Sequence, residues 1–495
     1  MAPISFGRRT AQLAELHPDE AALVFARTDG TERVVTWAEL DGWANQMARL
    51  LEERGVGPRS MVAVALPNSP EHVAVDIAGW RLGACVLPLR PDLPDWERRR
   101  LLDVASPAVL VGDWPAEGHT VVSSAELDGA RSLPAGPVED RVPDPAFAIA
   151  TSGSTGRPKL IVSPGPGVYD AEAPTALHQG MGAARRPVQL VPAPMYHTNG
   201  YRILHLALDR DELVVLMERF DAALAAELIE RHRVTSVTMA PVMLLRLARL
   251  EGIEERDLTS VTSILQGAAS CPPWLVRWWI EHVGPEHFFI SYGASERVGL
   301  AFLRGDEWLA HPGSVGRGLN TDIRILDDEG GDLPTGEVGE IFLRQTSDEP
   351  SGYRYVGAPP AKQTPDGFTS LGDMGWLDTD GYLYIADRRV DMIVTGGANV
   401  FPAEVEAALL EHPEVADCAV VGLPDEEWGS RVHAVVQPRH PGKPPAEDDL
   451  RRHCRERLAG YKVPKSVSFM SPLPRTEAGK LNHGALAAQL AGGTG

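Results

Sequence analysis

In the first half of the chain, short apolar runs alternate with amphipathic segments. Residues 61–66 form an apolar run typical of a strand, and the stretch 71–82 after it has helical periodicity. Asp221 is placed to cap a helix over 222–232, and Pro241 suits the first position of a later helix. This alternation predicts a mostly parallel, helix-covered sheet, in which ligands bind at the carboxyl ends of the strands.

Residues 151–159 are rich in Gly, Ser and Thr and lie between two strand-like runs, 146–150 and 160–163. Free backbone N–H groups and short hydroxyls suit the oxygens of a polyphosphate, and Lys159 adds a positive charge. The spacing of a Walker A loop is absent. The segment therefore predicts a polyphosphate-binding loop of another type, with a flexible surface hairpin as the alternative.

The pattern changes after about Asp387, where shorter elements predict a small α+β unit. We expect strands over 392–395, 418–421 and 432–436 and helices over 402–410 and 447–458. The fold class expected is therefore α/β. It comprises a large N-terminal domain of helix-covered, mostly parallel sheets (residues 1–388) and a small mobile α+β C-terminal domain (389–495).

The charge and cysteine content exclude several classes of protein. The 495-residue chain has a net charge of −21, so neither nucleic acid nor an anionic membrane is an expected partner. An anionic substrate must then be attracted by local positive groups. The four cysteines form no metal-ligand or disulfide pattern, and no apolar run reaches about 18 residues. We expect a cytoplasmic protein.

Four further sites carry chemistry, each with a structural alternative. A single histidine in a position like that of His197 more often packs in the protein or caps a helix than takes part in a reaction. Tyr292 can stack on a base and Glu296 can hold Mg²⁺, although the segment around them is as often structural. Asp373 can accept both ribose hydroxyls. Lys480 follows a glycine, where a lysine is usually solvated surface.

Together these segments resemble the acyl-adenylate-forming enzymes, which include acyl- and aryl-CoA synthetases, nonribosomal adenylation domains and firefly luciferase. The resemblance covers almost the whole chain and keeps the family's order. The matching segments are 36–40, 66–70, 151–159, 194–200, 291–296, 372–373, 387–388, 396–406 and 474–480. The resemblance implies an AMP-forming acid–CoA ligase that uses ATP, Mg²⁺ and coenzyme A on a small carboxylic acid.

The resemblance also implies roles for individual residues. The catalytic residues would be Lys480, Glu296 and His197, with Glu296 also the metal ligand. The ATP phosphates would be bound by Thr151, Ser152, Gly153, Ser154, Thr155, Gly156, Lys159 and Ser295. The adenosine would be bound by Gly267, Ala268, Ala269, Tyr292, Gly293, Asp373 and Arg388. Coenzyme A would contact Gly397, Trp428 and Tyr461, and the acid pocket would contain Tyr196, Thr198, Met239, Ser291 and Arg297.

Three positions depart from the family pattern: Leu160 replaces a glycine, Ser295 a threonine and Val390 a polar hinge residue. In the family the small domain rotates about that hinge, withdrawing the lysine and opening a path for the thiol. Val390 therefore bears on the transfer of the acyl group to the thiol rather than on formation of the acyl-adenylate.

Several alternatives stay open. The acceptor can be a carrier-protein pantetheine or an amine, relatives also activate nitrite, and a nucleotide-binding pseudoenzyme is a further option. Arg202 and Arg297 either hold a polar or extra-anionic acid or point outward to Asp209 or Asp211. An aryl or medium-sized acid is favoured over a long chain. A monomer and a homodimer are both compatible with the sequence.

Overall fold

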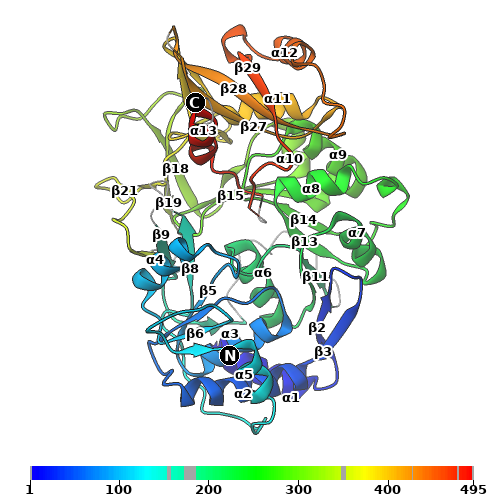
Figure 1. Ribbon diagram of the computed structural model, residues 1–495, viewed down its shortest axis with the longest axis vertical. Coiled ribbons are helices and arrows are strands. Elements are labelled where there is room, and N and C mark those ends of the chain that lie inside the picture. Colours follow the sequence, from blue (N-terminus) through cyan, green and yellow to red (C-terminus); the bar gives the residue numbers. More distant parts are fainter. Residues whose placement is uncertain are drawn as a thin grey trace.

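The computed structural model describes residues 3–152, 158–171, 186–346, 353–425, 427–476 and 479–492, with the side chain of Ser152 excluded. Its main part is a body of several sheets and their helices, from which a smaller lobe carrying the C-terminal elements projects at the top of Figure 1. The expected α/β fold class is confirmed.

The largest sheet in the described part of the chain has nine strands, in the order β17-β16-β15-β14-β13-β11-β12-β2-β3. The strands from β15 to β2 are parallel, and antiparallel strands lie at both edges. The parallel strands are Ala21–Ala26 (β2), Val188–Val191 (β11), Leu213–Met217 (β12), Ser236–Met239 (β13), Ser263–Gln266 (β14) and Phe288–Gly293 (β15). The edge strands are Glu32–Thr36 (β3), Leu300–Arg304 (β16) and Arg317–Gly318 (β17).

Helices connect the parallel strands, as the green elements of Figure 1 show. They bury their apolar residues in two cores that also contain residues of the sheet. These helices are Thr198–Asp209 (α6), Ala222–Arg231 (α7), Pro241–Ala248 (α8) and Pro273–Val283 (α9). The Asp221 side chain accepts a hydrogen bond from Leu224 N and begins α7. Pro241 is the first residue of α8. Both helix starts predicted from the sequence are confirmed.

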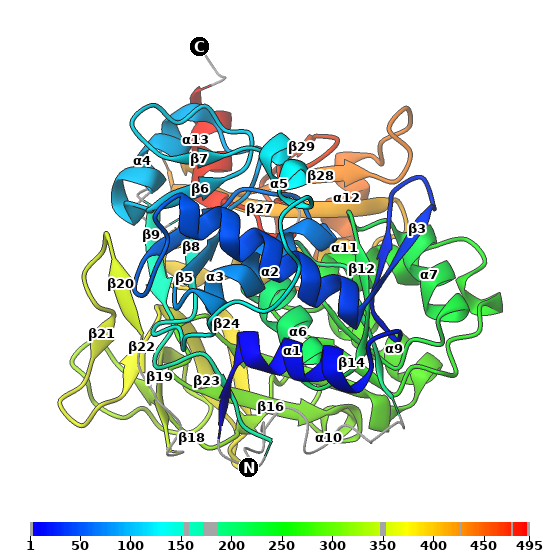
Figure 2. The same ribbon diagram turned by 90° about the horizontal axis from the view of Figure 1, so that it is seen from below.

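A second parallel sheet near the N-terminus has the strand order β5-β4-β6-β7. Its strands are Met61–Val64 (β4), Cys85–Pro88 (β5), Val109–Val111 (β6) and Val121–Val122 (β7). The helices near it are Phe6–Leu16 (α1), Trp37–Glu53 (α2), Pro70–Arg81 (α3), Asp95–Ala105 (α4) and Ser124–Ala130 (α5). Figure 2 shows α1 and α2 lying across this side of the molecule. With α3 they pack over an apolar core that contains residues of β4, β5 and β6.

Two antiparallel sheets complete the body. The first has the order β20-β9-β8 and contains Ala148–Ser152 (β8), Pro158–Val162 (β9) and Arg354–Val356 (β20). The strands expected on either side of the Gly-rich segment are therefore confirmed. The second sheet contains Thr321–Leu326 (β18), Gly339–Gln345 (β19), Lys362–Gln363 (β21), Thr369–Ser370 (β22), Asp373–Leu377 (β23) and Leu383–Arg388 (β24). Short elements elsewhere in the body are Ile4–Ser5 (β1), Val168–Tyr169 (β10) and Gly305–Ala310 (α10).

The C-terminal elements form the smaller lobe, which has its own apolar core. Its strands are Ile393–Thr395 (β25), Ala398–Val400 (β26), Val415–Asp425 (β27), Gly429–Pro438 (β28) and Ser466–Phe469 (β29). Its helices are Pro402–Leu410 (α11), Glu447–Arg455 (α12) and His483–Gly492 (α13). Helix α11 has the predicted bounds, β27 is longer than expected, and α12 gives way to a turn before Leu458. Among the described helices, none is long and apolar enough to cross a membrane.

Candidate active site

The carboxyl ends of the parallel strands bring several predicted residues to one edge of the nine-stranded sheet. Met239 ends β13, Gly267 follows β14, and Tyr292 lies near the end of β15. His197 lies in the segment between β11 and α6. Because parallel strands expose their carboxyl ends at the same edge, residues distant in sequence meet here, as expected for a ligand site in an open α/β sheet.

The predicted phosphate lysine and metal carboxylate lie next to each other. Lys159 Nζ is 3.4 Å from Glu296 Oε1, across from β9 to the turn after β15. Glu296 is 7% exposed, so its charge needs a partner, and Lys159 supplies one. The Tyr355 hydroxyl on β20 donates a second hydrogen bond of 2.6 Å to the same oxygen. The sequence did not indicate Tyr355. Gly153, Ser154, Thr155 and Gly156 lie outside the described residues.

The predicted nucleoside residues form a second connected group. The Tyr292 hydroxyl donates a hydrogen bond of 2.7 Å to Asp373 Oδ2, and Arg388 Nε lies 3.3 Å from Asp373 Oδ1. Asp373 and Arg388 are direct partners across β23 and β24. Burial, with the nearby Asp373 charge second, raises the pKa of Tyr292, so the phenol keeps its proton. Gly267, Ala268 and Ala269 follow β14 beside Ser291, whose hydroxyl donates to Gln266 O at 3.3 Å.

Lys480 reaches this site on a tight turn from the smaller lobe. Thr476 N donates to Lys480 O and Gly479 N donates to Thr476 O, both at 2.8 Å. Gly479 lies against α8 so closely that a Cβ would be 2.2 Å from Val242 Cγ1. In Figure 1 this is the red loop that descends from the upper lobe toward β15. The turn is thus inserted against the main body.

The electrostatic surroundings of Lys480 follow from this insertion. Desolvation by the neighbouring protein atoms and, second, the Arg388 charge lower the pKa of Lys480, while the Glu296 charge opposes that change. The residue is nevertheless exposed at its surface. Lys480 is therefore within electrostatic reach of the nucleoside group through Arg388 and of the metal carboxylate through Glu296. Lys480 thus adds a positive charge that interacts with both Arg388 and Glu296, where it would stabilise a phosphate.

Arg475 fixes the turn to the smaller lobe. Its guanidinium forms two hydrogen bonds with Asp417 on β27, at 2.7 and 2.9 Å, and donates a third of 3.1 Å to Gly479 O. Paired in this way, a mostly buried arginine holds the hairpin in one geometry. Arg475 lies inside the 474–480 motif, but that sequence signal did not reveal its partner.

His197 lies at the start of α6 and is held there by the backbone. A Cβ on Gly200 would be 2.2 Å from Pro194 O, so only glycine permits this close turn. Asn68 supports the segment before it by accepting from Met195 N at 2.7 Å and donating to Ala193 O at 3.1 Å. Burial, followed by the charges of Lys480 and Arg90, lowers the pKa of His197 to about 3. The imidazole is therefore neutral near pH 7.

The predicted acid-pocket residues lie near His197. The Tyr196 ring packs on the His197 ring with centroids 4.6 Å apart, and the Thr198 hydroxyl shares a short hydrogen bond with Ser295. Met239 is buried, whereas Ser291 and Arg297 are half-buried. Arg202 is also half-buried, and the Asp211 carboxylate pairs with His17 and Arg186. His17 and Arg186 therefore compete with the outward pairing of Arg202 or Arg297 to Asp211 that the sequence suggested.

The residues predicted to contact coenzyme A gather in the smaller lobe. Gly397 is exposed between β25 and β26, and the adjacent Gly396 N donates to Trp428 O at 3.0 Å. Trp428 and Tyr461 are 41% and 46% exposed. Tyr461 lies in the short helix Gly460–Lys462, which packs against β26. Exposed aromatic rings near a glycine turn are suited to an external ligand rather than to the core.

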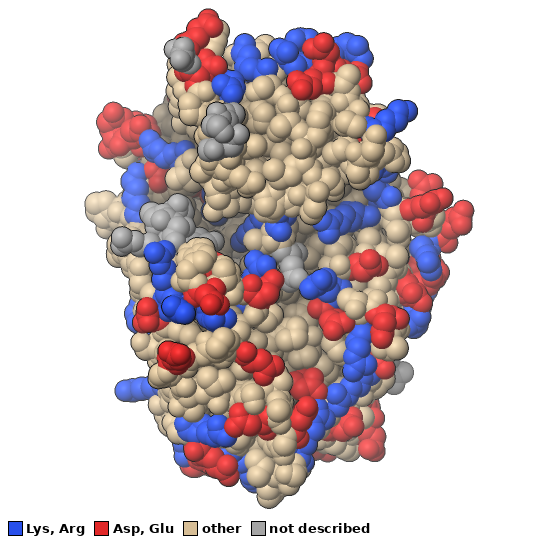
Figure 3. Space-filling model, in the orientation of Figure 1, with Lys and Arg blue, Asp and Glu red and all other residues tan. Residues whose placement is uncertain are grey.

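Local positive charge accompanies the site despite the acidic composition. In Figure 3, Lys and Arg side chains gather along the waist between the upper lobe and the main body, whereas the remaining surface is mixed in charge. Such a distribution attracts an anionic ligand to the waist while the net charge of −21 disfavours polyanions elsewhere.

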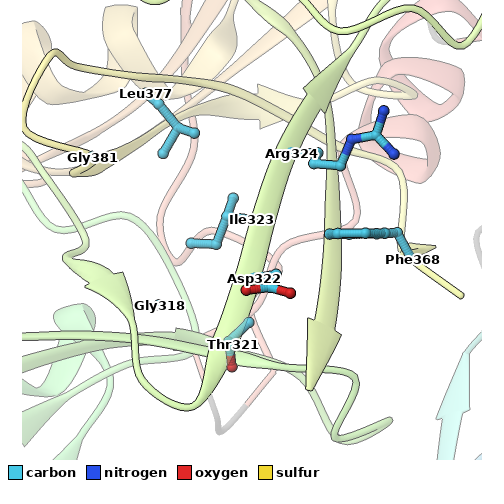
Figure 4. Close-up of a pocket in the computed structure, with 8 residues that line it drawn as sticks. All are labelled: Gly318, Thr321, Asp322, Ile323, Arg324, Phe368, Leu377 and Gly381. Atoms are coloured by element: carbon cyan, nitrogen blue, oxygen red, sulfur yellow. The ribbon is translucent and has the colours of Figure 1, made fainter. Parts of the chain in front are cut away.

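A hollow of about 430 Å³ lies away from this site, between β18 and the loops before and after β23 (Figure 4). Its polar groups are already paired. Arg324 binds Asp332 and Asp366 at 2.7 and 3.0 Å, and Asp322 binds Arg344 at 2.6 Å. None of the residues that line this hollow belongs to the predicted site.

Two of the twelve buried side-chain polar atoms that lack a hydrogen-bond partner in the described part of the chain belong to predicted site residues. In the described part of the chain, Thr151 Oγ1 and His197 Nε2 are buried without a hydrogen-bond partner, which costs free energy unless a ligand pairs with them. No cluster of three or more His, Cys, Asp or Glu side chains that could hold a metal occurs among the described residues. A metal at Glu296 would therefore share phosphate oxygens and water, as Mg²⁺ does. These residues fit a magnesium nucleotide.

Comparison with known proteins shows the family of the chain. The family model of AMP-binding enzymes matches residues 10–348, and that of the AMP-binding enzyme C-terminal domain matches residues 404–480. The chain is 33% identical to indoleacetate–CoA ligase of Aromatoleum aromaticum, with 94% of each chain covered. It also resembles o-succinylbenzoate CoA synthetase of Bacillus subtilis solved with its acyl-adenylate intermediate (28% identity, TM-score 0.82, 98% of both chains covered). The same enzyme solved with ATP and magnesium gives 28% identity and a TM-score of 0.81, covering 97% of this chain and 98% of that one.

Proposed function

This chain belongs to the family of AMP-binding enzymes and is an AMP-forming acid–CoA ligase, and we propose that its acid is aryl-bearing or medium-sized. The enzyme joins a carboxylic acid to ATP as an acyl-adenylate and releases pyrophosphate. It then transfers the acyl group to coenzyme A. In the first step a carboxylate oxygen bonds to the α-phosphorus as the bond to pyrophosphate breaks. In the second, the thiol sulfur displaces AMP and its proton passes to solvent.

The observation that carries the residue assignments is that the turn bearing Lys480 is inserted against the main body, where its charge interacts with those of Arg388 and Glu296. Attack on the α-phosphate brings two anions together, and a lysine between them stabilises the charge that grows in the transition state. Lys480 is inserted for this role, with Gly479 packed on Val242. We assign Lys480 as the catalytic lysine of adenylation, and the neutral His197 as a hydrogen-bonding group for the reacting carboxylate or phosphate.

The nucleotide would be held by the Lys159–Glu296 pair and by the group of Tyr292, Asp373 and Arg388. Lys159 and Thr151 would bind the outer phosphates together with Ser152 and residues 153–156. Asp373 would accept the ribose hydroxyls, and Tyr292 would lie against adenine. Ser295 would approach the α-phosphate, and Glu296 would hold magnesium. The metal, when bound, neutralises phosphate charge and orients the pyrophosphate leaving group.

The second half-reaction would use the other face of the smaller lobe. Gly397, Trp428 and Tyr461 lie there, and the exposed rings of Trp428 and Tyr461 offer an apolar surface to the pantetheine or adenine of coenzyme A. We infer that residues 389–495 rotate as a unit about Val390 relative to residues 1–388. That rotation would remove Lys480 from the site and bring Gly397 toward the acyl carbonyl.

The acid pocket supports the proposed substrate class. In this proposal Tyr196 and Met239 would supply an aromatic and a flexible apolar wall, and Thr198, Ser291 and Arg297 would add polar groups around it. This mixture suits an aromatic ring or a short branched acid better than a long alkyl chain. Indoleacetate and o-succinylbenzoate, the acids named for two similar enzymes, are both aryl acids, whereas another relative at 30% identity is named a long-chain fatty acid–CoA ligase. We also propose that the enzyme works in the cytoplasm, as a monomer or a homodimer, and its mass in solution distinguishes these two forms.

An acid screen tests this proposal. ATP–pyrophosphate exchange is measured across arylacetic, cinnamic, benzoic, medium-chain, long-chain and dicarboxylic acids at equal concentration, with nitrite included. We expect kcat/KM for the best aryl or medium-sized acid to exceed that for palmitate by at least about tenfold, equivalent to about 1.4 kcal/mol of transition-state binding. Exchange that is highest with long-chain acids or with nitrite would contradict the proposed acid class.

A further inference from the structure

Tyr355 occupies a position that neither the sequence motifs nor the family resemblance assigned. Its hydroxyl donates a hydrogen bond of 2.6 Å to Glu296 Oε1, and its ring lies under Lys159, with Nζ 3.8 Å from the ring centroid. One side chain thus contacts both the phosphate lysine and the metal carboxylate. Lys159 Nζ and Glu296 Oε1 are themselves only 3.4 Å apart, so the three groups close a triangle.

Strand pairing places Tyr355 there. Strand β20 runs antiparallel to β9, with Tyr355 directly opposite Ile161. Lys159 is two residues from Ile161 and shares its face of β9, so it is a diagonal neighbour of Tyr355. Tyr353 stands two residues away on the same face as Tyr355, and the two rings pack with centroids 4.6 Å apart. This support holds the Tyr355 ring in one orientation.

The two contacts act on different charges. The hydroxyl binds one oxygen of Glu296, which orients the carboxylate and leaves the second oxygen to a metal. The ring attracts the Lys159 ammonium through its negative face, which keeps the lysine near the carboxylate without covering its N–H donors. Burial, followed by the hydrogen bond to Glu296, raises the pKa of Tyr355, so the hydroxyl remains a donor throughout the physiological range.

We propose that Tyr355 is a positioning residue that orients Glu296 for magnesium and Lys159 for the outer phosphates of ATP. This inference rests on the proposed function, because it takes Glu296 as the metal carboxylate. Tyr355 acts through its two neighbours and does not touch the reacting atoms. Its hydroxyl serves the metal, and its ring serves the lysine. The two contributions are therefore separable by substitution.

The test is the affinity of the full-length enzyme for ATP without any acid, measured by calorimetry in excess Mg²⁺ and again in EDTA. Tyr355→Phe keeps the ring and removes the hydroxyl, whereas Tyr355→Leu removes both. Tyr382→Phe is the matched control, because the Tyr382 hydroxyl donates a hydrogen bond of 3.0 Å to Glu307 in another part of the molecule. Melting temperatures of all variants monitor folding.

For Tyr355→Phe we expect the Mg²⁺-dependent gain in ATP affinity to fall about tenfold, while the affinity in EDTA changes less than about twofold. Tyr355→Leu weakens ATP binding in both conditions, since Lys159 also loses its support. Tyr382→Phe leaves both affinities unchanged. A Tyr355→Phe enzyme with an intact Mg²⁺ gain, or with tighter ATP binding, would overturn the proposal.

The proposed function and this inference fail in different ways. Wild-type enzyme that binds ATP equally in Mg²⁺ and EDTA would overturn the metal role of Glu296, and the positioning role of Tyr355 with it. Wild-type enzyme with normal Mg²⁺-dependent binding but long-chain specificity would contradict only the proposed acid. A normal wild-type gain that Tyr355→Phe reduces supports the positioning role, whichever acid is the substrate.

Discussion

Gly479 lies against Val242 with no room for a side chain, since a Cβ on the glycine would be 2.2 Å from Val242 Cγ1. Gly479 also has φ 77°, a conformation that costs an alanine about 1 kcal/mol or more. Because Gly479 directly precedes Lys480, this contact sets how far the lysine enters the site. The smaller lobe and the main body thus meet at the residue before Lys480, the proposed catalytic lysine.

Gly479→Ala should impair the first half-reaction selectively. Overpacking of about 1–3 kcal/mol at this contact predicts a fall of about ten- to hundredfold in ATP–pyrophosphate exchange. Formation of acyl-CoA from synthetic acyl-adenylate should change less than about threefold, since the proposed rotation withdraws Lys480 in that step. Adding Val242→Ala should restore part of the exchange. If it restores none, backbone strain rather than the contact limits the variant.

Lys480→Gln should separate the two half-reactions more strongly. It removes the cation that interacts with Arg388 and Glu296 and leaves a polar side chain that is one atom shorter. We expect adenylation to fall by about 10²–10³-fold, the size typical of a lost charge-stabilising donor. Transfer from synthetic acyl-adenylate to coenzyme A should persist. A similar loss in both assays would show that Lys480 serves general stability or binding instead.

The hydrogen bond from Tyr292 to Asp373 predicts a ribose-specific effect. Asp373→Asn should raise KM for ATP by about tenfold, because the amide is a poorer acceptor for two hydroxyls. With 2′-deoxy-ATP or 3′-deoxy-ATP as substrate, the same substitution should cost less. Tyr292→Phe, which keeps the ring, should raise KM only about threefold. An equal penalty with all three nucleotides would place the ribose elsewhere.

His483 predicts a pH-dependent contribution to stability. Its Nε2 is 2.9 Å from Glu406 Oε1 and its Nδ1 is 3.9 Å from Asp391 Oδ2. Burial opposes the charge on His483, but the hydrogen bond to Glu406 and the charges of Glu406, Asp391 and Asp387 outweigh it, so the pKa is raised above 6.5. A raised pKa stabilises the fold fully below the unfolded value of 6.5, and that contribution is lost as pH rises through the folded pKa.

His483→Gln should therefore lower the free energy of unfolding more at about pH 6 than at about pH 9. Chemical denaturation at the two pH values measures the difference. His440→Gln, at an exposed histidine, is the control and should behave alike at both. A His483→Gln penalty that is larger at the alkaline pH would contradict the assigned sign.

Val390 is 69% exposed, so its side chain contributes little packing in this arrangement. If rotation about this residue serves thioester formation, Val390→Pro restricts the required backbone change. We expect slower acyl-CoA formation and unchanged adenylate formation, measured in separate half-reaction assays. Equal loss of both steps would remove Val390 as the hinge.

Local sequence signals predicted local structure well. Asp221 and Pro241 begin their helices as expected, because caps and first-turn prolines act within a few residues. Strand β27 was predicted too short, since it contains Gly422 and Pro424, which have low strand propensity. Pairing with β28 continues through both residues. Tertiary hydrogen bonding there overrides the local preference.

Long-range relationships explain what the sequence left out. Strand β2 joins the large sheet beside β12 through pairs such as Leu23 with Val214, which no local pattern predicts. Tyr355 is the corresponding case in the candidate site, because it too is placed by strand pairing between distant segments. Nothing in the segment around it indicates a ligand site, and it reaches Glu296 only because β20 pairs with β9. The residues in recognisable motifs were therefore predicted, whereas the residue that supports them was not.

Product analysis tests the central claim most directly. The enzyme is incubated with ATP, Mg²⁺ and its best acid, with and without coenzyme A, and the nucleotide and acyl products are identified by mass spectrometry. We expect AMP and pyrophosphate rather than ADP and phosphate, an acyl-adenylate held by the enzyme without coenzyme A, and free acyl-CoA with turnover when coenzyme A is present. Formation of ADP, or acyl-adenylate that coenzyme A never discharges, would contradict an AMP-forming acid–CoA ligase.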